Sequence, residues 1–348
     1  MQRLSAILAV GLFVATVSII AQQQAQPARQ EGAAAAPPAA AAAAPANLPR
    51  WAYGYPEPGA TPPPATPPAQ DDGSPKTLIG STGKFTLTQI RDGFGPADWH
   101  PGDHPPMPDI VARGRKDGNI RACALCHYPN GKGRAENAPV AGFPVAYFVQ
   151  QMADYRSGAR KSADPKKGNT NAMIAIAKAM TDEEILQSAQ YFGSMKWTPW
   201  IKVVESKTVP KTRIAGGLFI SLPGGETEAL GQRIIEMPED NAREALRDPR
   251  SGFVAYVPVG SIKKGEALVK TGGGRTTACA ICHGVDLKGL GPVPGLAGRS
   301  PSYSARQMFD MQTGARAGLW SDLMKPVVAK LTEEDLINIS AYTASLAP

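Results

Sequence analysis

The chain has 348 residues, a formal net charge of +7 and 43% hydrophobic residues, a balance typical of a globular protein of about two domains. The positive charge favours acidic partners, but no dense run of Lys and Arg is present, which argues against nucleic-acid binding. All four cysteines fall in two CxxC pairs. None is therefore left over for a structural disulfide or for lipid attachment.

The N-terminus has the pattern of an export signal. Arg3 precedes an apolar run in residues 4–20, which predicts a secretory signal over residues 1–21. The run is nearly long enough to span a membrane, so an uncleaved anchor is the alternative. Residues 22–75 are rich in Ala, Pro and Gln and predict a disordered, partly polyproline linker. The aromatic residues that interrupt this tract either dock on the body of the protein or have no specific role: Trp51, Tyr53 and Tyr55.

The chain repeats itself at an offset of 156 residues. The sequence ACALCH at 122–127 recurs as ACAICH at 278–283, and Ala-Gly, Gln-Met and Gly-Ala-Arg follow each copy at the same distances. A repeat of this length indicates a duplicated domain. We expect one copy in residues 108–195 and the other in residues 261–348. An irregular lead-in, residues 76–107, precedes them, and an insertion, residues 196–260, separates them.

Both copies are predicted to be all-α. Residues 145–155 and 303–311 have apolar side chains at helical spacing. Thr181 followed by Glu184 matches the capping box that begins a helix.

The insertion has a different pattern. Residues 202–210 and 214–221 are typical of short strands, and residues 238–247 of a short helix. This predicts a small β-hairpin-bearing element that either braces the two domains or docks a partner.

The motif C-x-x-C-H is the attachment signature for c-type haem. Two thiols one helical turn apart reach the two vinyl groups of a porphyrin, and the adjacent histidine binds the iron. Zinc binding, thioredoxin-like redox chemistry and two disulfides are weaker interpretations, because the pairs lie 156 residues apart, no βαβ pattern is present and disulfides leave the histidines unexplained. We predict two covalently bound haem c groups, held by Cys123, Cys126, His127, Cys279, Cys282 and His283.

The chain resembles the class I cytochrome c superfamily, in particular its two-domain di-haem members. The resemblance rests on CALCH, AG, QM, GAR, M and TDEE of the first copy and on CAICH and its equivalents in the second. The resemblance implies tandem cytochrome c-like domains in the periplasm, each with an N-terminal helix that crosses a C-terminal helix. It also implies a methionine as sixth iron ligand, on a loop ahead of the last helix. Met173 and Met324 occupy that place, so the predicted metal ligands are His127, Met173, His283 and Met324.

Other residues compete for the sixth position. Met180, Met308 and Met311 are further thioethers near the motifs, although Met308, like Met152, falls on a helical face typical of core packing. His100 and His104 are the remaining histidines. We expect both in an exposed loop, with a bis-histidine haem as the alternative.

Groups around the iron ligands are also predicted. In the superfamily a loop proline accepts the hydrogen bond of the proximal imidazole, and Pro294 fits that place, whereas Pro139 is one residue out of register. Arg160 and Arg316 either face haem propionates or end solvated helices.

The expected function is electron transfer between redox proteins, with a dehydrogenase, an oxidase or another cytochrome as partner. A filled coordination shell suits an electron carrier and disfavours an enzyme. The alternatives are an electron-transfer subunit of a periplasmic dehydrogenase complex, a di-haem peroxidase or thiosulfate-oxidising enzyme with one open iron, and a haem-based sensor. Basic residues around the first motif either steer a partner with an acidic docking surface toward the haem or are ordinary solvated charges: Lys132, Arg134, Lys161, Lys166 and Lys167.

Overall fold

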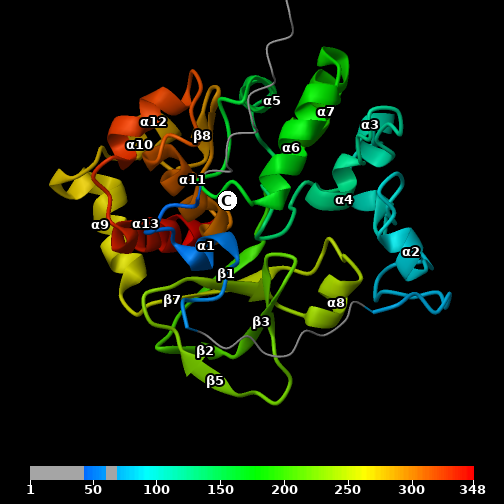
Figure 1. Ribbon diagram of the computed structural model, residues 1–348, viewed down its shortest axis with the longest axis horizontal. Coiled ribbons are helices and arrows are strands. Elements are labelled where there is room, and N and C mark those ends of the chain that lie inside the picture. Colours follow the sequence, from blue (N-terminus) through cyan, green and yellow to red (C-terminus); the bar gives the residue numbers. More distant parts are fainter. Residues whose placement is uncertain (1–42, 60–68) are drawn as a thin grey trace, which may run out of the picture. The chain divides into compact units, whose positions relative to one another are not determined.

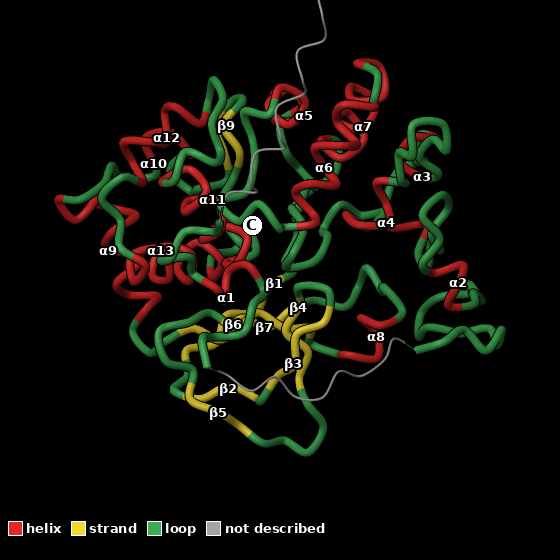
Figure 2. The backbone as a smooth tube through the Cα atoms, in the orientation of Figure 1, coloured by secondary structure: helices red, strands yellow, loops and turns green. Residues whose placement is uncertain are grey.

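The computed structural model describes residues 43–59 and 69–348. The predicted signal segment and much of the predicted disordered linker lie outside these residues. Within the described ranges, no helix has the length and apolar character needed to cross a membrane. Figure 1 labels the helices and strands, and Figure 2 separates them from the loops.

The first copy is helical, as predicted. Its helices are α3 (Asp109–Ala112), α4 (Cys123–His127), α5 (Val145–Ser157), α6 (Gly168–Ala179) and α7 (Asp182–Gly193). The capping box at α7 is confirmed, since Thr181 accepts a hydrogen bond from the Glu184 backbone and Glu184 accepts one from the Thr181 backbone. The predicted N-terminal helix of this copy is only the single turn α3. The chain turns at Gly114, with φ +62°, where a Cβ would collide with the Ile120 carbonyl oxygen.

The second copy contains α9 (Ser261–Thr271), the 3₁₀ turn η2 (Gly272–Gly274), α10 (Ala280–His283), α11 (Pro301–Gln312), α12 (Ser321–Val328) and α13 (Glu333–Ser345). Two short strands that the pattern did not predict, β8 (Gly289–Leu290) and β9 (Val293–Pro294), pair in antiparallel fashion. Helix α9 packs closely on α13. A Cβ at Gly265 would collide with the backbone carbonyl of Asn338, so the two helices approach as near as a glycine permits.

The insertion forms a larger β element than a hairpin. Its strands are β1 (Ile201–Glu205), β2 (Thr208–Pro210), β3 (Thr212–Ala215), β4 (Leu218–Ser221), β5 (Thr227–Ala229), β6 (Ile235–Pro238) and β7 (Phe253–Val257). The short helix α8 (Asn241–Ala245) is as predicted, but the segment 214–221, expected to be one strand, turns at Gly216 and Gly217 and contributes to the hairpin β3–β4. The segment 202–210, also expected to be one strand, contains β1 and β2. Strands β1, β7 and β6 add a mixed sheet, in which β7 pairs parallel with β1 and antiparallel with β6. Figure 1 shows these strands gathered in one region with α8 beside them.

The insertion contacts both copies through buried polar groups. On the first copy, the Tyr128 hydroxyl donates to Glu244 of α8 at 3.0 Å. On the second copy, the Glu236 carboxylate of β6 accepts from Ser300 Oγ at 2.7 Å and from the Ser302 backbone at 3.1 Å, at the start of α11. The insertion therefore braces the two copies.

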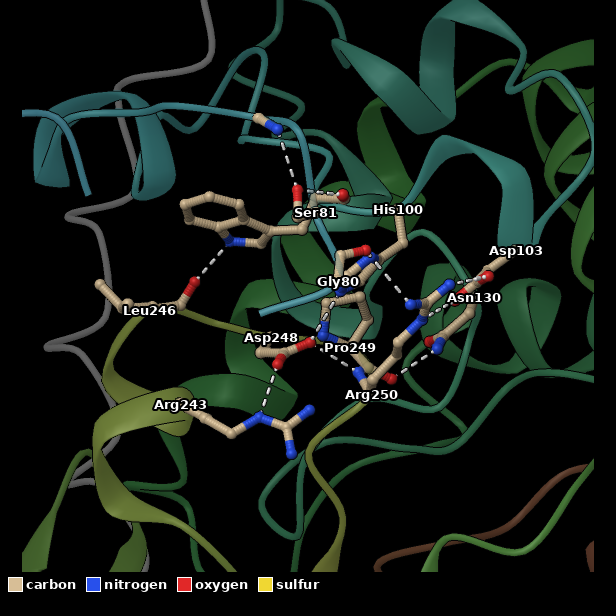
Figure 3. A network of polar contacts seen from close by, with 12 residues as sticks. Gly80, Ser81, His100, Asp103, Asn130, Arg243, Leu246, Asp248, Pro249 and Arg250 are labelled. Atoms are coloured by element: carbon tan, nitrogen blue, oxygen red, sulfur yellow. Dashed lines mark hydrogen bonds and ion pairs between the residues drawn. The ribbon is translucent and has the colours of Figure 1, made fainter. Parts of the chain in front are cut away.

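The lead-in, which contains α2 (Leu87–Ile90) and the turn η1 (Pro101–Asp103), is anchored on the insertion. Figure 3 shows the network. Trp99 Nε1 donates to the Leu246 carbonyl at 2.7 Å, and the Arg250 guanidinium donates two hydrogen bonds of 2.7 Å to the Asp103 carboxylate. Since these contacts join segments about 150 residues apart, the lead-in is part of the folded body.

Residues 43–55, here called the N-terminal strap, contain α1 (Arg50–Tyr53) and bridge the two copies. On the second copy, Trp51 Nε1 donates to Glu333 at 2.8 Å and the buried Tyr53 hydroxyl donates to Asp310 at 2.6 Å. On the first copy, Lys167 Nζ donates to the Tyr53 carbonyl at 3.0 Å. The aromatic residues of the Ala/Pro-rich tract therefore dock on the body of the protein.

Candidate haem-binding sites

Helix α4 carries the first CxxCH motif at the wall of a cavity of about 360 Å³. The cavity is largely apolar, and Cys123, Cys126 and His127 all line it. The second copy contributes part of the wall through Tyr303, Arg306 and Gln307 of α11. Two thiols and an imidazole at the wall of an apolar cavity are the donor set that a covalently attached haem requires.

None of the four cysteines, all of which lie in the described residues, forms a disulfide. Burial raises the pKa of the Cys123 thiol and of the Cys279 thiol to about 11 each. Both are therefore protonated at neutral pH and poor metal-binding thiolates. This environment disfavours a zinc site.

The two proximal histidines have the same environment. His127 Nδ1 donates to the Ala138 carbonyl and His283 Nδ1 to the Pro294 carbonyl, each at 2.8 Å and each 11 residues further along the chain. Burial lowers the pKa of both imidazoles, so both rings are neutral at pH 7. Because Nδ1 carries the proton, Nε2 keeps its lone pair for a metal. The expectation for Pro294 is confirmed, and in the first copy Ala138 takes that place instead of Pro139.

The expected methionines lie on helices and not on loops. Met173 belongs to α6 and lines the cavity of the first motif, together with Met152 and Met180. Met324 belongs to α12 and packs against the same hydrophobic cluster as Cys279. The segment around Met173 has no Pro or Gly between Asn169 and Ala179, so nothing interrupts the helix there.

His100 and His104 do not lie in an exposed loop, which corrects that expectation. The His100 ring is buried with Nε2 at 3.2 Å from Asp248, as Figure 3 shows. His104 Nε2 lies 3.2 Å from Asp98, and its Nδ1 donates to the Pro105 carbonyl. His100 therefore ties the lead-in to the insertion and His104 ties the lead-in to itself, and neither lines the cavity of the first motif.

Arg160 and Arg316 are buried between the two copies. The interpretation that they lie at solvated helix ends is therefore wrong. Both guanidinium groups donate to Gln151 and to Gln307, at 2.8 to 3.0 Å. The propionate interpretation stays a prediction.

Two of the five residues of the expected basic patch turn inward, whereas Lys161 and Lys166 are exposed. Arg134 is nearly buried and forms ion pairs with Glu136 at 3.1 Å and Glu244 at 2.6 Å. Lys167 is buried against the strap. The expectation is therefore wrong for Arg134 and Lys167, which pair with groups distant in sequence.

Two arginines of the second copy were missed by sequence reasoning. Arg299 donates to the Pro139 and Ala141 carbonyls, and Arg306 to the Ala135 and Glu136 carbonyls, on the loop that follows His127. Comparison of the two copies could have revealed them. At the offset of 156 residues, the first copy has Phe143 in place of Arg299 and Gln150 in place of Arg306.

A scan against protein-family models matches none of them. Among curated proteins, the chain is 25% identical to cytochrome c4 of Azotobacter vinelandii over 235 residues, 66% of this chain and 86% of that protein. It is 38% identical to cytochrome c-554(548) of Halomonas halodenitrificans over 68 residues, 19% of this chain and 82% of that protein. A protein of Thiomonas intermedia named thiosulfate dehydrogenase electron acceptor is 25% identical over 227 residues, 64% of this chain and 78% of that protein.

Together with the duplicated CxxCH motifs, these relationships establish that the chain belongs to the class I cytochrome c superfamily, as a tandem two-domain c-type cytochrome. It carries two covalently bound haem c groups and transfers electrons.

Proposed function

We propose that the first haem is held by Cys123, Cys126 and His127 with Met173 as sixth ligand, and the second by Cys279, Cys282 and His283 with Met324. We further propose the domain division set out above, with cytochrome domains in residues 108–195 and 261–348. The observation that carries this proposal is the matched environment of the two histidines, each neutral and each donating from Nδ1 to a carbonyl 11 residues away.

Haem supplies reversible one-electron chemistry at its iron. The chain's own groups position and tune it. The Ala138 and Pro294 carbonyls orient the imidazoles and raise their basicity as ligands. Helix α5 and helix α6 line the first cavity with apolar side chains that exclude water, Phe148 and Ile176 among them. A methionine near each motif fills the coordination shell, which favours an electron carrier over an enzyme with an open iron.

The second motif offers the better surface for a redox partner. Ile281, inside the second CxxCH, is 67% exposed, whereas its counterpart Leu125 is only 6% exposed. The difference arises because the insertion covers the first motif, where Arg247 donates to the Leu125 carbonyl at 2.6 Å. More exposed apolar side chains flank the second motif and Met324: Val285, Leu290, Leu319 and Leu323. An apolar patch of this kind is typical of a protein-binding surface.

We propose a periplasmic location and a dehydrogenase as electron donor. The export-signal pattern of residues 1–21 supports the location. The relative named thiosulfate dehydrogenase electron acceptor supports the donor class. The net charge of +7 favours a partner with an acidic surface through long-range attraction, with the apolar patch providing the contact.

The test is an optical spectrum of the purified oxidised and reduced protein, scaled to total haem from a pyridine haemochrome assay. We expect two haems per chain, a long-wavelength methionine-to-iron band that accounts for both, and a reduced form that ignores carbon monoxide. One haem that lacks the band and binds the gas would overturn the electron-carrier assignment in favour of an enzyme. Replacement of Cys279 and Cys282 by Ala should halve the covalent haem content.

A further inference from the structure

The interface between the two copies is almost symmetric, but its charges are not. Tyr147, Gln151, Asp154 and Arg160 of the first copy recur as Tyr303, Gln307, Asp310 and Arg316 of the second. Two positions break this pattern: Phe143 corresponds to Arg299, and Gln150 corresponds to Arg306. The second copy therefore brings two extra cations to the interface.

Both cations extend into the first copy. Arg306 lines the cavity that holds the first CxxCH motif. Arg299 stacks its guanidinium on the Phe143 ring at 4.3 Å and donates to the Pro139 and Ala141 carbonyls at 2.9 and 3.0 Å. These carbonyls lie beside Ala138, the acceptor of the His127 hydrogen bond. Arg306 thus reaches the first site at the cavity wall, and Arg299 reaches it through the loop that follows His127.

Both guanidinium groups are buried. Among the residues that the structure describes, every hydrogen-bond acceptor of the two groups is a backbone carbonyl. Burial lowers the pKa of Arg299 to about 10, so it is still cationic at pH 7. The carboxylate on the cavity wall, Glu136, is paired with Arg134. A buried charge acts more strongly on its neighbours than one in water.

At the two corresponding positions the first copy carries no charge. Gln150 is neutral, half-buried and donates to Asp154 at 2.8 Å. Phe143 is buried under Arg299.

We infer that the second domain supplies Arg299 and Arg306 as tuning residues that raise the reduction potential of the first haem relative to the second. The physical reason is that the oxidised haem carries one more positive charge than the reduced haem, so a nearby buried cation destabilises the oxidised form. Electrons that enter at the exposed second motif are therefore drawn toward the first haem. This inference rests on the proposed function, because it requires a haem at each motif.

The experiment compares Arg306→Gln, which installs the residue of the first copy, with Arg306→Lys and with Arg233→Gln as a control in the insertion. Arg233 also donates to backbone carbonyls, those of Leu230 and Ala229, but does not line the cavity. The potential of each haem is read separately, from a redox titration followed by the resolved haem-methyl signals in NMR. We expect Arg306→Gln to lower the potential of the first haem and to shift the equilibrium for electron sharing three- to tenfold toward the second haem, where tenfold corresponds to about 59 mV for one electron. The lysine variant should retain most of the native distribution, and the control all of it.

The inference is overturned if Arg306→Gln leaves the sharing of electrons between the two haems unchanged. It is also overturned if the lysine and glutamine variants shift that equilibrium equally. A purely structural role predicts the opposite sign, because a loosened loop weakens the His127 hydrogen bond, lowers the basicity of the ligand and raises the potential. If Arg306→Gln does not accumulate, Arg299→Gln carries the same test with the same expected sign. Fewer than two haems in the unaltered protein would instead refute the proposed function.

Discussion

Arg160 and Arg316 pair their backbones across the boundary between the two domains and share the same two acceptors, Gln151 and Gln307. On either side of this bridge, the Lys161 amide donates to the Ala315 carbonyl and the Ala317 amide to the Ala159 carbonyl, both at 2.8 Å. Each of these contacts therefore has an equivalent contact in the other copy. A polar junction with paired groups of this kind fixes one orientation between two separate apolar cores.

Replacement of Met324 by Ala should open the second haem iron to external ligands. We expect the reduced variant to bind one carbon monoxide per two haems and to lose half of the long-wavelength band. Met308→Ala is the matched control, because Met308 packs against the same cluster from helix α11. Gas binding that is identical in the two variants would remove Met324 from the ligand set.

Gly265→Ala should destabilise the second domain. The added methyl group meets the Asn338 carbonyl at the contact of α9 and α13, and overpacking of this kind costs about 1–3 kcal/mol. Gly168→Ala is the control, since no atom lies within 4 Å of a Cβ there. Urea denaturation should show a lower midpoint for the first variant and a native or higher midpoint for the second. Equal midpoints would mean that the helices separate at no cost.

Tyr53→Phe should loosen the strap. The substitution removes the donor at 2.6 Å from Asp310 Oδ1, which still accepts from the Ala163 amide, and the loss of one such hydrogen bond costs about 1 kcal/mol in the free energy of unfolding. The same substitution at Tyr55, which donates to Asp164 at a more exposed site, should cost less. Limited proteolysis should cleave the strap faster in Tyr53→Phe. A rate equal to that of the unaltered protein would contradict the proposed bridging role.

Glu236→Gln should remove one component of the pH dependence of stability. Burial raises the pKa of Glu236 in the folded protein above its unfolded value of about 4.3, although Ser300 and Ser302 donate to it. Between those two pKa values the folded chain holds a proton that the unfolded chain has lost, so stability falls as the pH rises.

The unaltered protein and the Glu236→Gln variant should therefore unfold with similar free energies at pH 4, and the variant should become the more stable of the two toward pH 7. Chemical denaturation at each pH measures the difference. A difference that does not change with pH would show that Glu236 titrates normally.

The features that the sequence predicts well are those that depend on residues close together in the chain. The CxxCH motifs, the capping box at Thr181 and the helix that begins at Val145 depend on neighbours within one or two turns. The inward positions of Arg134 and Lys167 could not be predicted, since their partners Glu244 and Tyr53 lie about a hundred residues away. Strand β7 joins β1 across about fifty residues for the same reason.

The strap also imposes an order on assembly. Trp51 and Tyr53 lie 282 and 257 residues before their acceptors Glu333 and Asp310. The strap cannot close until helices α11 and α13 have formed, so it docks only after the second copy has folded. With a protease that cuts only the open strap, the fraction of chains that resist cleavage would measure the fraction of molecules whose second domain has folded.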